Sequence, residues 1–291
     1  MPISPQRLFS PFPSEAYIRI REAPTNELFH YTTPAGLLGI ASDRKIRATH
    51  VQLLNDATEL KHAIGLGVAE LKGRIGGMGP ARKLVVERAI TLLETRQRAY
   101  LGLTSFSEKG DQLSQWRGYC AQGGYSLGFS PSVLLATAKA NKATLAKCIY
   151  DESEQRDFIR AIADSFIPTI VQSDAAAPDQ RAVTVVNSLM RVVPLMKHPS
   201  FQEEQEWRMF RHVSATAGWQ FRTTNNLLIP YLEFKLCADL QGNLFSRVIA
   251  GPHDHQRTLA VGANLLNLNR GSPWSTFEWS KIPYRTLHRR S

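Results

Sequence analysis

The sequence predicts an α+β fold in one domain, with a partly antiparallel mixed sheet and helical insertions. Short apolar runs such as 27–31 and 245–249 are typical of strands, and longer amphipathic runs such as 82–97 and 153–170 are typical of helices. The two kinds of run follow one another without a regular strand–helix–strand rhythm. This order argues against a doubly wound parallel sheet.

The composition is that of a folded globular protein. The chain has 291 residues, of which 43% are hydrophobic and 21% are charged, so it can bury the core of one large domain or two small ones. No apolar run is long enough to cross a bilayer, and the first residues lack the apolar segment of a signal peptide. We therefore expect a cytoplasmic protein without a membrane partner.

The cysteines and the net charge indicate which kinds of site and partner to expect. Cys120, Cys148 and Cys237 are widely spaced, which predicts buried thiols and neither a disulfide framework nor a metal site. The net charge of +10 suits a polyanionic partner, such as a nucleic acid or a phosphorylated cofactor. The basic residues are scattered, however, and the only tight cluster is terminal, at 288–290.

The first third of the chain reads as an arm followed by alternating short elements. Residues 1–26 carry Pro2, Pro5, Pro11, Pro13 and Pro24, which indicate an N-terminal arm. The elements expected next are a strand at 27–31, a helix at 35–41 begun by Thr32-Thr33-Pro34, an extended segment at 45–48, a helix from a cap at 55–59 to Leu71, a loop at 73–80 and a helix at 82–97.

The rest of the chain continues the mixture. Strands are expected at 99–107, 123–129, 146–150, 201–209, 232–236, 245–249 and 274–284. Helices are expected from Ser130-Pro131 to about Ala140, and at 153–170, 181–195 and 256–265. His253, Asp254 and His255 form the turn before the last helix, where Asp254 is a natural cap, so no metal is expected there.

The segment 201–209 is rich in acidic residues. Read as a strand, it places Glu204, Glu206 and Arg208 on one face, opposite Trp207 and Met209. Two carboxylates and a guanidinium in a row suit a site that stabilises developing positive charge. The alternative is a helical turn in which Glu204 and Arg208 form an i,i+4 ion pair.

Several motifs together resemble the bacterial family DUF2971, a domain of unknown function. They occur in the order of that family over roughly 27–265, and they are Leu28-Phe29-His30-Tyr31-Thr32-Thr33, Thr49-His50 through Leu54-Asn55-Asp56-Ala57-Thr58-Glu59, Thr104-Ser105-Phe106-Ser107, Leu113-Ser114-Gln115-Trp116-Arg117-Gly118-Tyr119, Gly124-Tyr125-Ser126-Leu127-Gly128-Phe129, Tyr150-Asp151, Lys197-His198 through Glu204-Gln205-Glu206-Trp207-Arg208, and Val248-Ile249-Ala250-Gly251-Pro252. Ala57 stands where the family usually has proline. The resemblance implies one DUF2971-like domain from 27 to 291.

A weaker resemblance is to the ADP-ribosyltransferases. Those enzymes carry a histidine or arginine on a first strand, a serine or tyrosine on a second element and a glutamate on a later strand; here the order is His30, Ser105 and Glu206. The resemblance implies an ADP-ribosyltransferase-like fold and an enzyme that cleaves NAD and transfers ADP-ribose to an acceptor protein or nucleic acid. It also implies a role as a toxin or phage-defence effector.

The roles implied by this second resemblance involve ten residues. Glu206 would stabilise the oxocarbenium ion formed as nicotinamide leaves, and Glu204 would orient the nucleophile. The residues expected to bind NAD are His30, Tyr31, Thr104, Ser105, Trp116, Arg117, Tyr119 and Arg208. Among them, His30 and Thr104 or Ser105 would contact ribose hydroxyls, and Arg117 would hold the pyrophosphate.

Purely structural roles are the alternative explanation for several of these residues. His30 fits a core histidine, Trp116 a core anchor, and the two glutamates a solvated acidic edge. A different function also stays open, namely a nucleic-acid-binding or RNA-processing protein in which the basic charge supplies the affinity.

Overall fold

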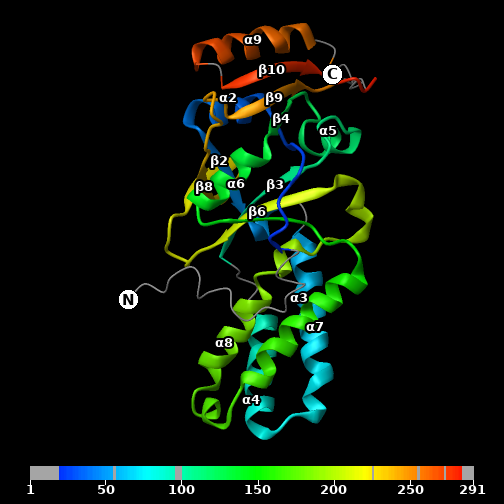
Figure 1. Ribbon diagram of the computed structural model, residues 1–291, viewed down its shortest axis with the longest axis vertical. Helices are drawn as coiled ribbons and strands as arrows, with labels where there is room; N and C mark the ends of the chain where they lie inside the picture. The colour runs from blue at the N-terminus through cyan, green and yellow to red at the C-terminus, as the bar shows by residue number, and fades with distance from the viewer. Residues whose placement is uncertain are drawn as a thin grey trace. The chain divides into compact units, whose positions relative to one another are not determined.

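The computed structural model describes residues 20–54, 57–95, 100–224, 226–253, 256–271 and 273–283. Within these residues the chain divides into two compact units (Figure 1). One is helical and comes mainly from Val51–Tyr100 and Ala146–Gln202. The other contains the sheet and comes from Ala23–His50, Leu101–Leu145 and the described part of Glu203–Ser291. A single domain that contains a helical insertion would also divide into two such units. The single domain expected from residue 27 to 291 therefore stays a prediction.

One mixed sheet of ten strands, counted over the described residues, confirms the predicted α+β class. The strand order is β10-β9-β4-β1-β3-β2-β8-β7, with β6 pairing β3 and β5 pairing β6. β10 runs parallel to β9, whereas the other strand pairs with a defined register are antiparallel. The strands are β1 (Leu28–Thr32), β2 (Lys45–His50), β3 (Leu101–Ser107), β4 (Tyr125–Phe129), β5 (Thr144–Lys147), β6 (Glu206–His212), β7 (Gln220–Thr224), β8 (Leu227–Lys235), β9 (Phe245–Ala250) and β10 (Trp274–Trp279).

The helices fall into two groups, and their caps explain several starts. The sheet unit contains α2 (Pro34–Asp43), α5 (Leu113–Tyr119), α6 (Pro131–Ala140) and α9 (Gln256–Asn269). As predicted, Thr33 caps α2 by accepting from the Gly36 N–H, and Ser130 caps α6 by accepting from the Val133 N–H. The predicted cap at Asn55 and Asp56, and the one at Asp254, lie outside the described residues.

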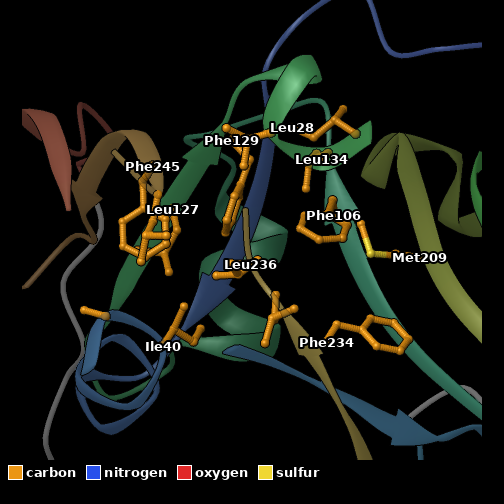
Figure 2. Packing of buried hydrophobic residues seen from close by; sticks show 14 of the residues in the cluster. Leu28, Ile40, Phe106, Leu127, Phe129, Leu134, Met209, Phe234, Leu236 and Phe245 are labelled. Carbon is orange, nitrogen blue, oxygen red and sulfur yellow. The ribbon is translucent and has the colours of Figure 1, made fainter. Parts of the chain in front are cut away.

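The main hydrophobic core covers one face of the sheet, which we call the core face (Figure 2). Phe129 lies at its centre, with ring centroids 5.6 Å from Phe106 and 5.2 Å from Phe245, both edge-on. Helices α2 and α6 supply the residues that close the core, Leu37, Ile40, Ala41, Val133, Leu134 and Ala138. A smaller cluster on the opposite face contains Phe29, Tyr31, Trp116, Cys120 and Ile249.

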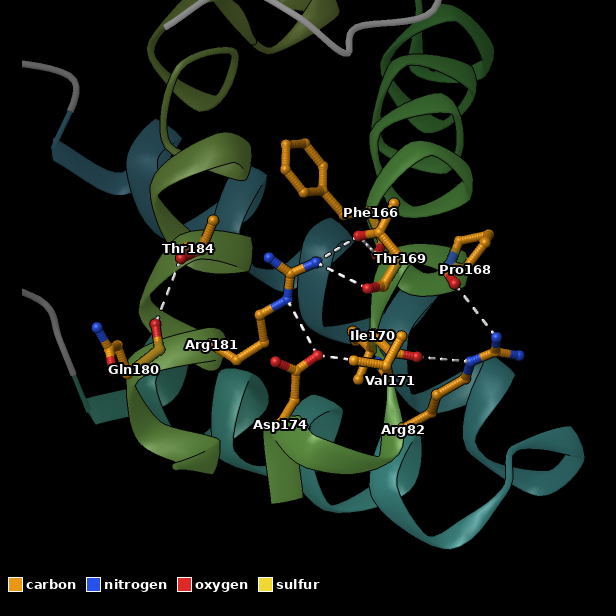
Figure 3. A network of polar contacts seen from close by, with 10 residues as sticks. All are labelled: Arg82, Phe166, Pro168, Thr169, Ile170, Val171, Asp174, Gln180, Arg181 and Thr184. Atoms are coloured by element: carbon orange, nitrogen blue, oxygen red, sulfur yellow. Dashed lines mark hydrogen bonds and ion pairs between the residues drawn. The ribbon is translucent and has the colours of Figure 1, made fainter. Parts of the chain in front are cut away.

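The helical unit is built from α3 (Ala57–Arg74), α4 (Pro80–Thr95), α7 (Glu152–Phe166) and α8 (Pro178–Leu189). Arginines hold the α7–α8 connection in place (Figure 3). Arg82 donates to the carbonyls of Ile170 and Pro168, at 3.3 and 3.2 Å. Arg181 donates to the Thr169 carbonyl at 3.1 Å and lies 3.6 Å from the Asp174 carboxylate. Each arginine therefore satisfies loop carbonyls that no helix or strand pairs.

Several boundaries differ from those predicted, for local reasons. The helix expected to reach residue 170 ends at Phe166 and is followed by a short 3-10 turn, because Pro168 cannot donate a helical hydrogen bond. Similarly, α8 ends at Leu189 instead of 195, and a 3-10 turn containing Pro194 follows it. β5 begins two residues before the predicted strand, while α5 and β7 were not predicted. The buried thiols expected at Cys120 and Cys148 are confirmed, whereas Cys237 is only half-buried, so the prediction is wrong there.

Candidate functional site

The sheet forks beside β3. Along one edge β3 pairs with β6 over its whole length, from Leu101 to Ser107. Along the other edge it pairs with β2 at Gly102 and Leu103, and with β1 only at Ser107. The stretch Thr104–Phe106 lies between these pairings and has no strand neighbour on that edge within the described chain. We call this stretch, where β1 and β2 diverge, the strand fork.

His30 fills the strand fork from β1. Its Nδ1 lies 2.9 Å from the carbonyl oxygen of Ser105, and because a carbonyl only accepts, Nδ1 carries the proton. The imidazole lies 5.8 Å from the Phe106 ring between centroids, on the core face. Burial lowers the pKa of His30, which favours the neutral ring. The ring thus replaces a missing ladder hydrogen bond.

Glu206 and Arg208 form a buried ion pair on the opposite face, which we call the carboxylate face. Arg208 donates from Nε to Glu206 Oε1 at 2.8 Å and from Nη2 to Oε2 at 3.3 Å. The Arg208 side chain is only 7% exposed and the Glu206 side chain only 6%. Trp207 and Met209 alternate with them and enter the core, as a strand requires. The predicted alternation over 206–209 is therefore confirmed, and the alternative of a helical turn is wrong.

Two serines of β3 share the carboxylate face. In the antiparallel register Ser107 stands opposite Glu206, and Ser105 stands opposite Arg208. Directly paired residues project to the same side of a sheet. The Ser107 hydroxyl donates to the Glu204 carbonyl at 2.7 Å and accepts from the Lys109 N–H at 3.0 Å. Hydroxyls and charges from adjacent strands thus gather at one end of the face.

Glu204 does not lie on this strand, which corrects the prediction of three charged residues in a row. It ends a 3-10 helix, Pro199–Glu204, and the next residue, Gln205, has a left-handed φ of 43°. A left-handed residue cannot continue a strand, so the alternation starts only at Glu206. The backbone carbonyl of Glu204 meets β3 through Ser107.

Tyr31 shares the carboxylate face and anchors the loop after β3. Its hydroxyl donates to the Lys109 carbonyl at 2.7 Å and accepts from the Gln112 N–H at 3.0 Å. Burial raises the pKa of this phenol well above its ordinary value of 10.0. Tyr31 is thus a neutral anchor that fixes a loop beside the serines.

Helix α5 carries three residues that were expected to bind NAD, Trp116, Arg117 and Tyr119, and it places them in different surroundings. Trp116 is buried, lies 4.7 Å from the Tyr31 ring between centroids and donates from Nε1 to Asp111 at 2.7 Å. Arg117 and Tyr119 are exposed. Trp116 is therefore a core anchor, which was the alternative explanation, and it cannot stack on a nucleotide base as placed.

His30, Ser105 and Glu206 were expected to converge, and the structure brings only two of them together. Ser105 and Glu206 project from adjacent strands to the carboxylate face, whereas the His30 ring lies on the core face and reaches only the Ser105 backbone. Thr104 also projects to the core face, opposite Met209, and its buried hydroxyl has no hydrogen-bond partner among the described residues. The alternation of side chains along a strand explains both placements.

Sequence reasoning missed Ser107 and Asp111. Ser107 belongs to the motif Thr104-Ser105-Phe106-Ser107, and its period-two spacing from Ser105 was the available signal. Asp111 accepts from the Ser280 hydroxyl and from the Lys281 N–H, at 2.6 and 2.8 Å, as well as from Trp116. No local signal pointed to Asp111, because two of its three partners, Ser280 and Lys281, lie about 170 positions away in the sequence.

Neither a metal-binding cluster nor a membrane-spanning helix is present among the described residues. No group of three or more His, Cys, Asp and Glu side chains there is arranged to hold a metal ion. No helix of these residues has the length and apolar character needed to cross a membrane.

Comparison with known proteins gives one match. The family model described as "Protein of unknown function (DUF2971)" matches residues 115–209. This segment runs from Gln115 in α5 to Met209 in β6 and therefore includes Glu206 and Arg208. No curated protein and no solved structure matches the chain. The predicted resemblance is thus confirmed, and over residues 115–209 the chain carries the DUF2971 domain signature.

Proposed function

We propose that this protein is an ADP-ribosyltransferase-like enzyme that cleaves NAD and transfers ADP-ribose to a macromolecular acceptor. The observation that carries the proposal is the buried Glu206 carboxylate of β6, on the same face of the sheet as Ser105 and Ser107 of β3. An ADP-ribosyltransferase-like fold belongs to the same proposal. It is supported by the positions of His30, Ser105 and Glu206 on three adjacent strands, β1, β3 and β6.

The proposed reaction breaks the bond between C1′ of the ribose and the ring nitrogen of nicotinamide. Nicotinamide leaves with the bonding electron pair and becomes neutral, while positive charge develops on the ribose ring. A nearby carboxylate stabilises such an oxocarbenium ion, and this is the role assigned to Glu206. A nucleophilic group of the acceptor then bonds to C1′ and loses its proton. If water takes that place, the same site hydrolyses NAD.

The surrounding residues receive roles that follow from their placement. Arg208 fixes the orientation of the Glu206 carboxylate through two contacts. Ser105 offers a hydroxyl on the same face for a ribose hydroxyl. His30 is a positioning residue, since its ring holds the Ser105 carbonyl in the fork.

Helix α5 supplies the proposed phosphate contact. Arg117 is exposed next to Gly118, which allows an anion to approach closely, so the pyrophosphate is assigned to Arg117. Tyr119, 40% exposed, is the aromatic of this helix that offers a stacking surface. Arg117→Ala should weaken binding of NAD roughly tenfold to a hundredfold, the effect of losing a hydrogen bond to a charged group.

The setting proposed for this activity is the cytoplasm, where NAD is available as substrate. An enzyme that consumes NAD or modifies a macromolecule there would act as a toxin or as a phage-defence effector. The net charge of +10 suits both an anionic dinucleotide and an acidic or nucleic-acid acceptor.

The test is nicotinamide release from NAD by purified protein, with and without cell extract as a source of acceptor. Wild-type protein should release nicotinamide, and Glu206→Gln should reduce the rate by a factor on the order of a hundred, since a preorganised charge is lost. Glu233→Gln is the matched control, because this carboxylate lies on β8 and pairs with Lys45 at the surface. Its rate should equal that of wild type.

The outcomes separate the hypotheses. No nicotinamide release by the wild type in either condition would reject NAD cleavage. Binding of RNA or DNA that falls steeply with salt would then support the nucleic-acid function instead. A fully active Glu206→Gln protein, with its fold verified by circular dichroism, would contradict the assignment of the catalytic carboxylate.

A further inference from the structure

β7 leaves one edge of the sheet open. It is the last strand in the order, and among the described residues no strand pairs with its outer edge. On the inner edge it pairs with β8 from Gln220–Tyr231 to Thr224–Leu227. An open edge presents backbone N–H and C=O groups that another extended chain can pair with.

A proline determines which backbone groups face outward. Pro230 of β8 stands opposite Phe221, and proline has no N–H to donate. The pair therefore suits a non-hydrogen-bonded position of the antiparallel ladder, where both residues turn their backbone groups away from each other. By alternation, Phe221 and Thr223 direct their N–H and C=O groups to the outer edge.

Two large apolar side chains of this hairpin are exposed. Phe221 is 58% exposed and Leu228 is 62% exposed. Thr223 stands opposite Leu228, so Leu228 and Phe221 project to the same face of the hairpin. β7 carries one charged residue, Arg222, and no proline, so no proline of its own blocks an incoming strand.

Arg222 projects to the other face of the hairpin, opposite Ile229. Its Nε atom is buried and has no hydrogen-bond partner among the described residues. The carboxylate of Glu233, which lies on β8 two positions beyond Tyr231, already pairs with Lys45 at 2.6 Å. The buried Nε is closed to a partner, but the Arg222 side chain is only half-buried, so its positive charge can attract a carboxylate of a paired strand.

We propose that the outer edge of β7 binds an extended acidic segment of another protein by strand addition. Backbone bonds form with Phe221 and Thr223, a carboxylate of the partner faces Arg222, and an apolar side chain of the partner packs on Phe221 and Leu228. A second copy of this chain fits less well. In the fully overlapping antiparallel register it would set the two Arg222 side chains opposite each other, which is unfavourable. The proposal is independent of the NAD chemistry.

The probe is a short labelled peptide that alternates valine and glutamate, compared with one that alternates valine and lysine. Fluorescence anisotropy measures the two dissociation constants with the full chain. The glutamate peptide should bind at least roughly tenfold more tightly than the lysine peptide, the scale of one hydrogen bond to a charged group. Thr223→Pro removes one outward N–H and should weaken binding by a similar factor, whereas Thr223→Ala keeps the N–H and should bind like wild type.

Arg222→Glu provides the second variant and should reverse the preference, so that the lysine peptide binds more tightly. Circular dichroism and thermal unfolding verify that each variant is folded. Failure of the wild type to bind the glutamate peptide would overturn the proposal, as would equal binding by Thr223→Pro. A concentration-dependent dimer that Thr223→Pro abolishes, without peptide binding, would assign the edge to a second copy instead.

Discussion

The ion pair between Glu206 and Arg208 allows a quantitative prediction about stability. Both side chains are at least nine-tenths buried, and the guanidinium meets both carboxylate oxygens. Glu206→Gln preserves the shape but removes the negative charge that Arg208 meets through two contacts. Removing one member of such a pair lowers the free energy of unfolding by about 3–5 kcal/mol. Glu206→Met and Arg208→Met should each have a similar effect, because each removes one charged member of the buried pair.

The double variant Glu206→Met/Arg208→Met should be far more stable than the sum of the single losses suggests. The singles would add to about 6–10 kcal/mol, whereas replacing a whole buried pair by apolar residues is often close to neutral. Urea unfolding followed by tryptophan fluorescence measures the wild type, the single variants and the double variant. Glu233→Gln, at a surface pair with side chains 42% and 36% exposed, should lose less than about 1 kcal/mol.

Additivity would refute this reasoning. If the double variant loses as much as the two singles together, the residues do not act as a pair, and the described contacts do not account for their burial. The same unfolding measurements also support the nicotinamide-release assay. They show whether the Glu206→Gln protein is folded under the conditions in which its activity is measured.

Three further predictions concern single positions. Thr104→Val should raise the free energy of unfolding by about 1 kcal/mol, measured in urea, because the buried hydroxyl lacks a partner; a loss of stability would contradict this. Gly251→Ala should lower it by about 1–3 kcal/mol, since a Cβ there would lie 2.9 Å from the Trp116 ring, and an unchanged urea midpoint would show that the ring moves aside. Burial lowers the pKa of His30 and of His50 below the ordinary 6.5, so below that pH the unfolded chain binds protons that the folded chain lacks. Stability should therefore fall as the pH drops below about 7, and less steeply in His30→Gln; an identical slope would exclude His30 as a source.

Local patterns predicted much of the fold. The caps at Thr33 and Ser130 and the alternation from Glu206 to Met209 depend on neighbouring residues, and each is confirmed. The left-handed conformation of Gln205 was not predictable, because nothing in its residue type demands a positive φ.

The site was less predictable than the elements. The position of the His30 ring depends on where β1 leaves β3, which is a property of strand pairing over 75 positions of sequence. A pattern of residues along one strand indicates which side chains share a face, but not which face of a neighbouring strand they meet. The order of His30, Ser105 and Glu206 along the chain could therefore be recognised from the sequence. Which face of the sheet each side chain occupies could be known only from the strand register.

The pairing of β3 with β6 also affects how the protein forms during synthesis. Ser105 and Ser107 leave the ribosome roughly a hundred residues before His212 completes β6, an interval of about 5–20 s at ordinary rates of translation. During that interval one edge of β3 has no native partner, and the carboxylate face does not exist. A nascent chain therefore cannot carry out the proposed chemistry until the helical segment Ala146–Gln202 and then β6 have been synthesised. Premature termination within that segment yields a product that lacks Glu206.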